Sequence, residues 1–180
     1  HASGGYLQWL DHFDPLKGSG LERARLNAGQ FTSGPLISVV LPVYNTPLVF
    51  LRRCIDSVRG QTYQNWELCI ADDASPDART VECLMAYARD DARIKVVVRE
   101  SNGHISEATN SALALATGSH VAFLDHDDEL SADALHQVVL ALAEHPQARL
   151  LYSDEDKIDA AGRRFEPHFK PGWNPELLRS

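Results

Sequence analysis

Four acidic side chains, Asp125, Asp127, Asp128 and Glu129, follow directly after the apolar run HVAFL. Carboxylates this close together resist full ionisation unless a cation or a strong hydrogen-bond donor neutralises them. Mg²⁺ and Mn²⁺ are hard cations that take oxygen ligands, so the cluster predicts a metal site. Alternate positions of an extended chain share a face, so Asp125 and Asp127 should point alike while Asp128 turns away. The alternative is a solvated acidic loop that leads into the N-terminus of a helix, where negative charge is favoured.

A second pair of carboxylates, Asp72 and Asp73, follows the apolar run WELCIA in the sequence DDASPD. Either side chain could accept a hydrogen bond from a base N–H group or a sugar hydroxyl. Aspartates before proline are also ordinary turn residues, so a purely structural role stays open. Tyr44, in the sequence PVYN, could stack on a flat ring, although a single tyrosine there would more often be a rim aromatic.

The sequence NGHISEATN contributes Gly103, which permits a left-handed backbone or a close approach, and Asn110 seven residues later. A helix that begins here could direct its N-terminus at phosphate oxygens. His104 and His126 could act as ligands, but isolated histidines are more often polar fillers.

These residues lie among alternating strand and helix patterns. Continuous apolar, β-branched runs predict strands over 37–41, 66–71, 94–98, 120–124 and 149–153. Amphipathic patterns predict helices around 50–58, 81–88, 105–116 and 135–142. The alternation predicts an α/β fold with an open, mostly parallel sheet flanked by helices. Ligands of such sheets bind beyond the carboxyl ends of the strands, where the polar sequences above are found.

The first residues differ from the rest, and we expect a helical extension over residues 1–34 before a main domain over 35–180. Tyr6, Trp9, Leu10 and Phe13 fall at helical spacing, and residues 21–31 continue a helix-like pattern. An aromatic stripe of this kind usually packs against the main domain, and a partner-docking helix is the alternative.

Composition narrows the class of protein. A net charge of -8 and a pI near 5.4 disfavour nucleic-acid binding, which needs a dense basic face. Cys54, Cys69 and Cys83 are odd in number, lack CxxC spacing and lie in apolar surroundings, so we expect reduced thiols in the cytoplasm. Membrane insertion and export have no support, since no apolar run approaches the roughly 18 residues a span requires. Neither GxGxxG nor GxxxxGK[ST] occurs, which disfavours a dehydrogenase or a P-loop kinase.

Several motifs together carry a resemblance to a known family. They are PLISVVLPVYNTP, QTYQNWELCIADDASPD, NGHISEATNSALALATGSHVAFLDHDDEL and LLYSDEDKID. Their order and spacing from about residue 35 onward resemble the family 2 glycosyltransferases of bacteria, which have the GT-A nucleotide-sugar-binding fold. The chain looks especially like the branch that assembles O-antigen and other cell-surface polysaccharides.

The resemblance implies a site for each part of a nucleotide-sugar donor. The implied nucleotide-sugar-binding residues are Pro42, Val43, Tyr44, Asp72, Asp73, Asn110, Asp125 and Asp127. Of these, the first three would line the nucleobase pocket, and Asp73 with Asp72 would bind the base. In the DxD-type motif one aspartate would contact the ribose, and Asp127 or Asp128 would hold Mn²⁺ or Mg²⁺. At Asn110 the chain departs from the family pattern, because Thr109 precedes it where an arginine is usual.

The implied activity is metal-dependent, inverting transfer of a sugar from a UDP- or dTDP-sugar to the hydroxyl of a saccharide or lipid-linked saccharide. It would take place in the cytoplasm or at the inner membrane surface. Family members continue into an acceptor-binding half that supplies the general base, so we expect a longer parent chain with further domains. Asp154, Glu155 and Asp156 look by resemblance like sugar-pocket or structural residues. The alternative is a non-catalytic nucleotide-sugar-binding or interaction module; a phosphohydrolase is disfavoured because no nucleophile motif lies beside the acidic cluster.

Overall fold

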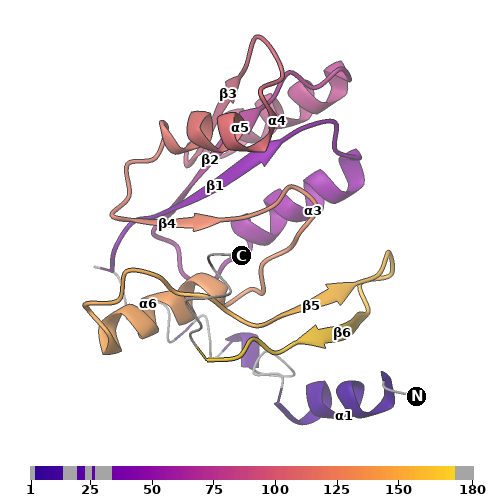
Figure 1. Cartoon of the computed structure of the whole chain (residues 1–180), viewed down its shortest axis with the longest axis vertical. Helices are drawn as coiled ribbons and strands as arrows, with labels where there is room; N and C mark the ends of the chain where they lie inside the picture. The colour runs from indigo at the N-terminus through magenta and orange to yellow at the C-terminus, as the bar shows by residue number, and fades with distance from the viewer. Residues whose placement is uncertain (1–2, 14–19, 23–25, 27–33, 173–180) are drawn as a thin grey trace.

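The computed structural model describes residues 3–13, 20–22, 26 and 34–172, and its centre is a four-stranded parallel sheet (Figure 1). The strands are β1 (Ile37–Val43), β2 (Trp66–Asp72), β3 (Ile94–Val98) and β4 (His120–Phe123). Their order is β3-β2-β1-β4, and every neighbouring pair is parallel. The predicted α/β fold with an open parallel sheet is therefore confirmed.

Strand β1 lies at the middle of the sheet and every one of its residues is buried. Ile37, Val39 and Leu41 point into the larger hydrophobic core. Val40 points to the other face, where it meets Ala112 in a smaller core. Because successive side chains of a strand alternate between faces, this run of apolar residues can be covered on both sides.

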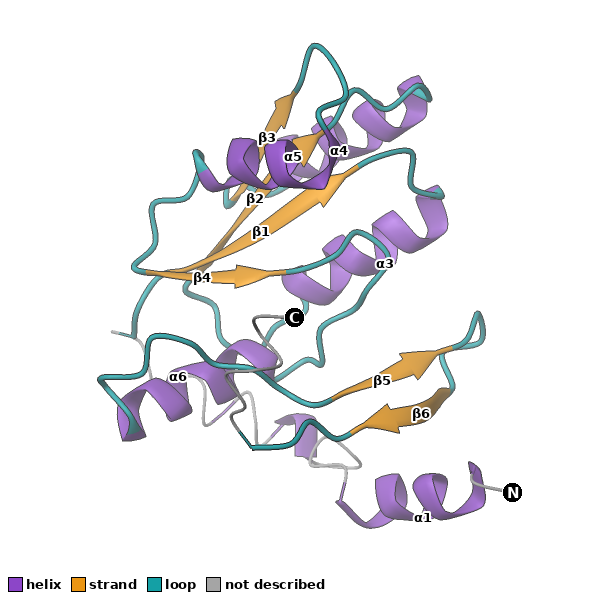
Figure 2. Ribbon diagram, viewed as in Figure 1, coloured by secondary structure: helices purple, strands orange, loops and turns teal. Residues whose placement is uncertain are grey.

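Four helices flank the sheet (Figure 2). They are α3 (Leu48–Arg59), α4 (Ala78–Asp90), α5 (His104–Leu113) and α6 (Ala134–Glu144). α3 buries Leu51, Cys54, Ile55 and Val58 in the larger core, which is the predicted amphipathic stripe. α5 contributes Ala112 to the smaller core on the opposite face. The four predicted helices are thus confirmed, with small differences at their ends.

The strand predicted over 149–153 is wrong. The chain is irregular there, and a two-stranded antiparallel hairpin follows, formed by β5 (Glu155–Ile158) and β6 (Arg164–His168). Leu150, Leu151 and Tyr152 are 57%, 37% and 49% exposed. An apolar run is stabilised as a parallel strand when a neighbour pairs with its backbone and both its faces are covered, and in the described part of the chain neither condition holds here.

Helix α1 (Ser3–Phe13) confirms the helix expected at the start of the chain. It packs against the β5–β6 hairpin, where the Tyr6 hydroxyl donates a hydrogen bond to the Asp156 carboxylate. The Trp9 ring meets the ring of Phe169 edge-on, with centroids 5.6 Å apart. Most of the helix expected over 21–31 falls outside the described residues, and the boundary at residue 34 stays a prediction.

All three cysteines are free and buried, as predicted. Burial raises the pKa of the Cys69 thiol to about 11, and it also raises the pKa of Cys83. In the ranges that the structure describes, no helix is both long and apolar enough to cross a membrane.

Candidate functional site

A cavity of about 440 Å³ opens at the carboxyl edge of the sheet, between the ends of β1 and β4. β1 pairs with β2 on one side and with β4 on the other, so the strand order reverses at this point. Such reversals are where open α/β sheets bind ligands. The volume is within the range of small-molecule sites. The lining residues are Pro42, Val43, Tyr44, Asp73, Asn102, His104, Ile105, Ala108, Asp125, His126 and Asp127.

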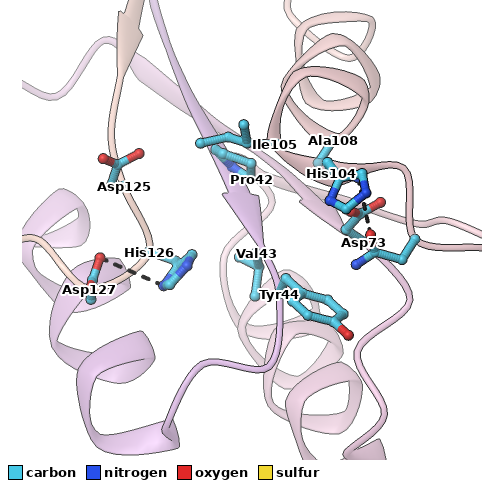
Figure 3. Close-up of a pocket in the computed structure, with 11 residues that line it drawn as sticks. Pro42, Val43, Tyr44, Asp73, His104, Ile105, Ala108, Asp125, His126 and Asp127 are labelled. Carbon is cyan, nitrogen blue, oxygen red and sulfur yellow. Dashed lines mark hydrogen bonds and ion pairs between the residues drawn. The ribbon is translucent and has the colours of Figure 1, made fainter.

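Pro42 and Val43 end β1, and Tyr44 follows them on the rim of the cavity (Figure 3). The Tyr44 side chain is 46% exposed, so its ring is available to a flat partner. The structure thus brings together the three residues expected at a nucleobase pocket.

Asp73 is held in place from two sides. It is 2% exposed, its carboxylate accepts a hydrogen bond from the Gly103 amide at 3.0 Å, and Arg99 Nε lies 2.8 Å from Oδ1. The close approach favours a glycine, because a Cβ at residue 103 would lie 2.8 Å from the Glu107 Cβ as well as 2.5 Å from the Arg99 guanidinium. The expected close approach of Gly103 is therefore found, although the left-handed residue is His104, with φ of 65°.

Asp72 does not line the cavity. It is fully buried, and its Oδ2 accepts a hydrogen bond from the Ser75 amide at 3.0 Å, as in an ordinary aspartate turn. The structure therefore separates the two neighbouring aspartates: Asp73 faces the cavity and Asp72 holds the turn behind it.

Strained backbone gathers at this edge. Asn45, Ala74 and His104 follow β1, β2 and β3, and all have positive φ, at 48°, 58° and 65°. A left-handed conformation costs a residue with a side chain roughly 1 kcal/mol, and such strain concentrates at functional sites. The loops after β1 and β2 are also joined, because the Asn45 amide donates to the Ser75 hydroxyl at 2.9 Å.

The acidic residues after β4 form the opposite wall of the cavity. Asp125 and Asp127 line it, across from Tyr44 and Asp73 in Figure 3, whereas Asp128 is not among the lining residues. The expected alternation of an extended chain is not found, because residues 126 and 127 form a turn that the Asp128 amide closes by donating to the Asp125 carbonyl at 3.1 Å. His126 also lines the cavity, with Nδ1 3.8 Å from the Asp127 carboxylate.

The carboxylates of this wall repel one another. Burial raises the pKa of the Asp128 carboxyl, and the charges of Asp127 and Asp125 raise it further. Beneath the wall, burial raises the pKa of the Cys54 thiol to about 12, and the charges of Asp128 and Asp127 add to the shift. A cation at this wall would relieve the repulsion.

The carboxylates of this wall fit a hard divalent cation that takes its remaining ligands from a bound substrate. Within residues 3–13, 20–22, 26 and 34–172, no three His, Cys, Asp or Glu side chains are arranged to hold a metal by themselves. Mg²⁺ is usually bound by one or two carboxylates together with waters and substrate phosphates, so a complete protein cage is not required. Adjacent carboxylates that repel one another beside a cavity meet this description.

Some of the lining residues were not expected from the sequence. Asn102, Ile105 and Ala108 lie at the start of α5, which the fold places over the carboxyl edge of β1. Asn110 is on the same helix but is exposed and does not line the cavity. Gly103 could have indicated these residues, because it marks the start of a helix at the carboxyl edge of the sheet, and the first turn of such a helix lies at the site.

The acidic residues of SDEDK form hydrogen bonds and ion pairs in and around the hairpin, and they do not line the cavity. Asp154 accepts a hydrogen bond from the Lys170 amide at 2.7 Å, and Glu155 pairs with the Lys170 ammonium at 2.9 Å. Asp156 receives the Tyr6 hydroxyl and the Arg164 guanidinium. Their contacts are those of structural residues.

Comparison with known proteins identifies the family. Residues 38–177 match the model of glycosyl transferase family 2, so the chain belongs to the family 2 glycosyltransferases. Protein y4gI of Sinorhizobium fredii is 53% identical over 146 residues, which are 81% of this chain and 16% of that protein. The O-antigen biosynthesis protein RfbC of Myxococcus xanthus is 43% identical over 175 residues, 97% of this chain and 14% of RfbC. The chain thus spans about a sixth or less of the length of these two relatives.

A solved structure has the same fold. Residues 1–349 of TarS from S. aureus, crystallised with UDP, align with a TM-score of 0.56 at 27% identity, covering 61% of this chain and 32% of that one. The mostly parallel sheet flanked by helices matches that neighbour and confirms the expected GT-A fold.

Proposed function

We propose that the chain forms the donor-binding part of a glycosyltransferase that transfers a sugar from a nucleotide sugar to an acceptor hydroxyl. The observation that carries the proposal is the cavity, in which Tyr44 and Asp73 lie on one side and Asp125 and Asp127 on the other. An aromatic ring beside a buried carboxylate suits a nucleobase, and the facing carboxylates suit a metal-bound diphosphate.

Each pocket residue has a proposed role. Pro42, Val43 and Tyr44 bind the faces of the base, and Asp73 accepts a hydrogen bond from a base N–H group. Arg99 and the Gly103 amide fix the orientation of that carboxylate before the donor arrives. Such preorganisation reduces the entropy lost on binding.

The carboxylates after β4 bind the rest of the donor. Asp125 contacts the ribose, and Asp127 with Asp128 would hold Mn²⁺ or Mg²⁺. A divalent cation there would neutralise the charge that develops on the departing nucleoside diphosphate. Asp72 supports the site from outside its lining, through the turn that it makes with Ser75. Donor contact by Asn110, which does not line the cavity, stays a prediction.

We further propose an inverting reaction in the synthesis of bacterial cell-surface polysaccharide, as the name of the relative RfbC suggests. The donor is a UDP- or dTDP-sugar, since uracil and thymine present the same edge to Asp73, and TarS was crystallised with UDP. The acceptor is a saccharide or a lipid-linked saccharide. Three unpaired cysteines favour action in a reducing compartment, which we take to be the cytoplasm or the surface of the inner membrane.

The test is a thermal-shift screen of UDP, dTDP, GDP and the corresponding sugars with Mn²⁺ and with EDTA. A ligand that binds only the folded chain adds RT ln(1 + [L]/Kd), or roughly 2.7 kcal/mol at a hundredfold excess over Kd. We expect a uracil or thymine nucleotide to shift the transition only with Mn²⁺. The double variant Asp127→Ala, Asp128→Ala should lose that shift, whereas Asp90→Asn, at the far end of α4, should keep it. A nucleotide shift that is the same in EDTA would contradict the metal assignment.

A non-catalytic binding module is the second candidate, and one observation favours it. The only carboxylates that line the described cavity are Asp73, Asp125 and Asp127, all of them assigned to the donor, so none of these is left to deprotonate an acceptor. Release of free nucleoside diphosphate from the preferred donor, measured with the chain alone, separates the two candidates. Mn²⁺-dependent binding without release favours the module.

A further inference from the structure

A row of side chains on α3 binds the backbone of the loop that carries the pocket carboxylates. This loop, residues 124–133 between β4 and α6, is called the acidic loop below. Cys54 and Ser57 belong to α3, and Gln61 follows its end at Arg59. The three are spaced three and four residues apart, which places side chains on one side of a helix.

Each of the three contacts a different part of the acidic loop or of the first turn of α6. The Cys54 thiol donates to the carbonyl of Asp125 at 3.4 Å, and the Ser57 hydroxyl accepts the Leu130 amide at 3.0 Å. The Gln61 side chain donates to the Ser131 carbonyl at 2.7 Å and accepts the amide of Leu135, in α6, at 3.0 Å. The row therefore follows the loop from its first carboxylate to the helix beyond it.

Two of the side chains also bond to the backbone of the preceding residue in the row. The Ser57 hydroxyl donates to the Cys54 carbonyl at 2.7 Å, and the Gln61 amide donates to the Ser57 carbonyl at 3.0 Å. Gln61 is 1% exposed, and both hydrogens of its side-chain amide and its carbonyl oxygen have partners. A buried polar group with every bond made fixes geometry strongly, because any displacement leaves a group unsatisfied.

None of these contacts brings a charge to the loop. Asp125, Asp127 and Asp128 repel one another, so the loop would spread unless its backbone were held. A lysine or arginine in the row would hold the loop but would also neutralise the carboxylates and compete with a cation. A thiol, a hydroxyl and an amide hold the backbone and leave the carboxylate charges in place for a ligand.

We infer that Cys54, Ser57 and Gln61 are positioning residues, which hold the acidic loop so that Asp125 and Asp127 face the cavity. The inference rests on the proposed function, because it takes this loop to bind the metal and the diphosphate. It goes beyond that function in assigning Mn²⁺-dependent binding to residues of α3 and its C-terminal turn that do not line the cavity.

The first experiment compares two glutamines of the loop between α3 and β2. Gln61→Met keeps the length of the side chain and removes its bonds to the acidic loop and α6. Gln64→Met is the matched control, because Gln64 bonds to Arg93 and to the carbonyl of Gln61 and, among the described residues, has no hydrogen bond to the acidic loop. UDP binding is titrated across Mn²⁺ concentrations, at a temperature where both variants are fully folded.

We expect Gln61→Met to weaken Mn²⁺-dependent UDP binding by about tenfold and to raise the Mn²⁺ concentration needed for half-maximal binding, since buried hydrogen bonds are lost. Gln64→Met should bind like the unmodified chain. A residue with a purely structural role would lower the melting temperature alone. The electron paramagnetic resonance signal of free Mn²⁺ provides a second readout that does not depend on the melting temperature.

The second experiment follows the backbone of the acidic loop by hydrogen exchange without nucleotide, alongside the UDP titration. Ser57→Ala removes the hydroxyl that accepts the Leu130 amide, and alanine is well tolerated in a helix. We expect hydrogen exchange at Leu130 to become several-fold faster and Mn²⁺-dependent UDP binding to weaken by roughly threefold. Ser57→Thr keeps a hydroxyl that can bond the carbonyl three residues earlier, so it should restore both values.

The outcomes separate the two proposals. If Gln61→Met and Ser57→Ala bind UDP and Mn²⁺ like the unmodified chain, or if Leu130 exchange does not change in Ser57→Ala, the positioning role is overturned and the proposed function stands. If the unmodified chain shows no Mn²⁺-dependent binding of any nucleotide in the screen, the proposed function is overturned, and the inference about metal binding falls with it.

Discussion

Glu67 lies near the amino end of β2, whereas Asp125, Asp127 and Asp128 follow the carboxyl end of β4, so one sheet carries carboxylates at both edges. Glu67 is 5% exposed and accepts hydrogen bonds from the Ser38 hydroxyl at 2.7 Å, the Lys95 ammonium at 2.7 Å and the Thr117 hydroxyl at 2.9 Å. The aspartates after β4 receive no comparable set of donors among the described residues, apart from the contact of His126 with Asp127.

Because of this difference in hydrogen-bond donors, the pKa of Glu67 is lowered and the pKa of Asp128 is raised. Burial alone would raise the pKa of Glu67, but the hydrogen bonds from Lys95, Ser38 and Thr117 outweigh it and lower the value to about 2. For Asp128, burial and the charges of its neighbours act together and raise the pKa. A carboxylate with hydrogen-bond donors around it stabilises the fold. Carboxylates that lack such donors and repel one another are available to a ligand.

The largest expected effect on stability comes from disrupting the hydrogen bonds of Glu67. Glu67→Gln replaces one acceptor oxygen by an NH₂ group that faces the donors of Lys95 and Thr117. We expect a loss of about 3 kcal/mol in the free energy of unfolding, measured by urea denaturation, since buried donors lose their partner. Exposed Glu100→Gln serves as the control and should change stability by less than about 0.5 kcal/mol. Equal stability of the two variants would show that the Glu67 network contributes nothing.

Acid should affect the two edges differently. The folded pKa of Glu67 lies below its ordinary value of 4.5, so its contribution is complete above about pH 4.5 and is lost as the pH falls towards about 2. We expect the unmodified chain to lose about 2 kcal/mol more stability than Glu67→Gln between about pH 5 and pH 3. Urea midpoints at the two pH values measure the difference. An equal loss of stability in the two proteins over this pH range would contradict the low pKa of Glu67.

A smaller effect should follow from removing one donor of the network. The Ser38 hydroxyl donates to Glu67 and accepts the Gly118 amide at 2.9 Å. Ser38→Ala should cost about 1 kcal/mol of stability: both hydrogen bonds of the hydroxyl are lost, but Gly118 keeps its contact with Glu67 at 3.2 Å and Glu67 keeps its other donors. Nucleotide binding, measured by titration, should stay unchanged; weaker binding would show that the two edges are coupled.

The smallest expected change in stability is of opposite sign. Asp128→Asn removes one charge from a group of repelling carboxylates, so we expect stability to stay level or to rise by a few tenths of a kcal/mol, as at most surface sites. The same variant should weaken Mn²⁺-dependent nucleotide binding by at least tenfold. Unfolding curves and titrations on one preparation test both statements, and a clear loss of stability would place Asp128 with Glu67 as a structural carboxylate.

Much of the site could be predicted from local sequence. The runs that form β1 to β4 are apolar enough to require cover on both faces, and polar residues at their ends then meet at one edge. Tyr44, Asp73, Asp125 and Asp127 were expected there, and all four line the cavity. The predicted alternation between Asp127 and Asp128 was wrong in its reason, because a turn and not an extended chain keeps Asp128 out of the lining.

Other features depended on contacts between distant residues. The run over 149–153 is as apolar as a strand, but strands need partners, and the sequence does not say which backbone is free to pair. Asp72 and Asp73 are neighbours in sequence and look alike there. In the structure Asp72 bonds to Ser75 in a turn, whereas Arg99 and Gly103 hold Asp73 at the cavity.

The sequence by itself determined the parallel α/β sheet and the edge at which chemistry gathers, because periodicity and strand-end residues are local properties. Only the tertiary structure decided which carboxylates are satisfied. Glu67 meets its donors from β1, β3 and the turn before β4, and the acidic loop is held by side chains more than sixty residues earlier in the chain. Hydrogen bonds require atoms within about 3 Å of each other, and sequence spacing does not report such proximity across a fold.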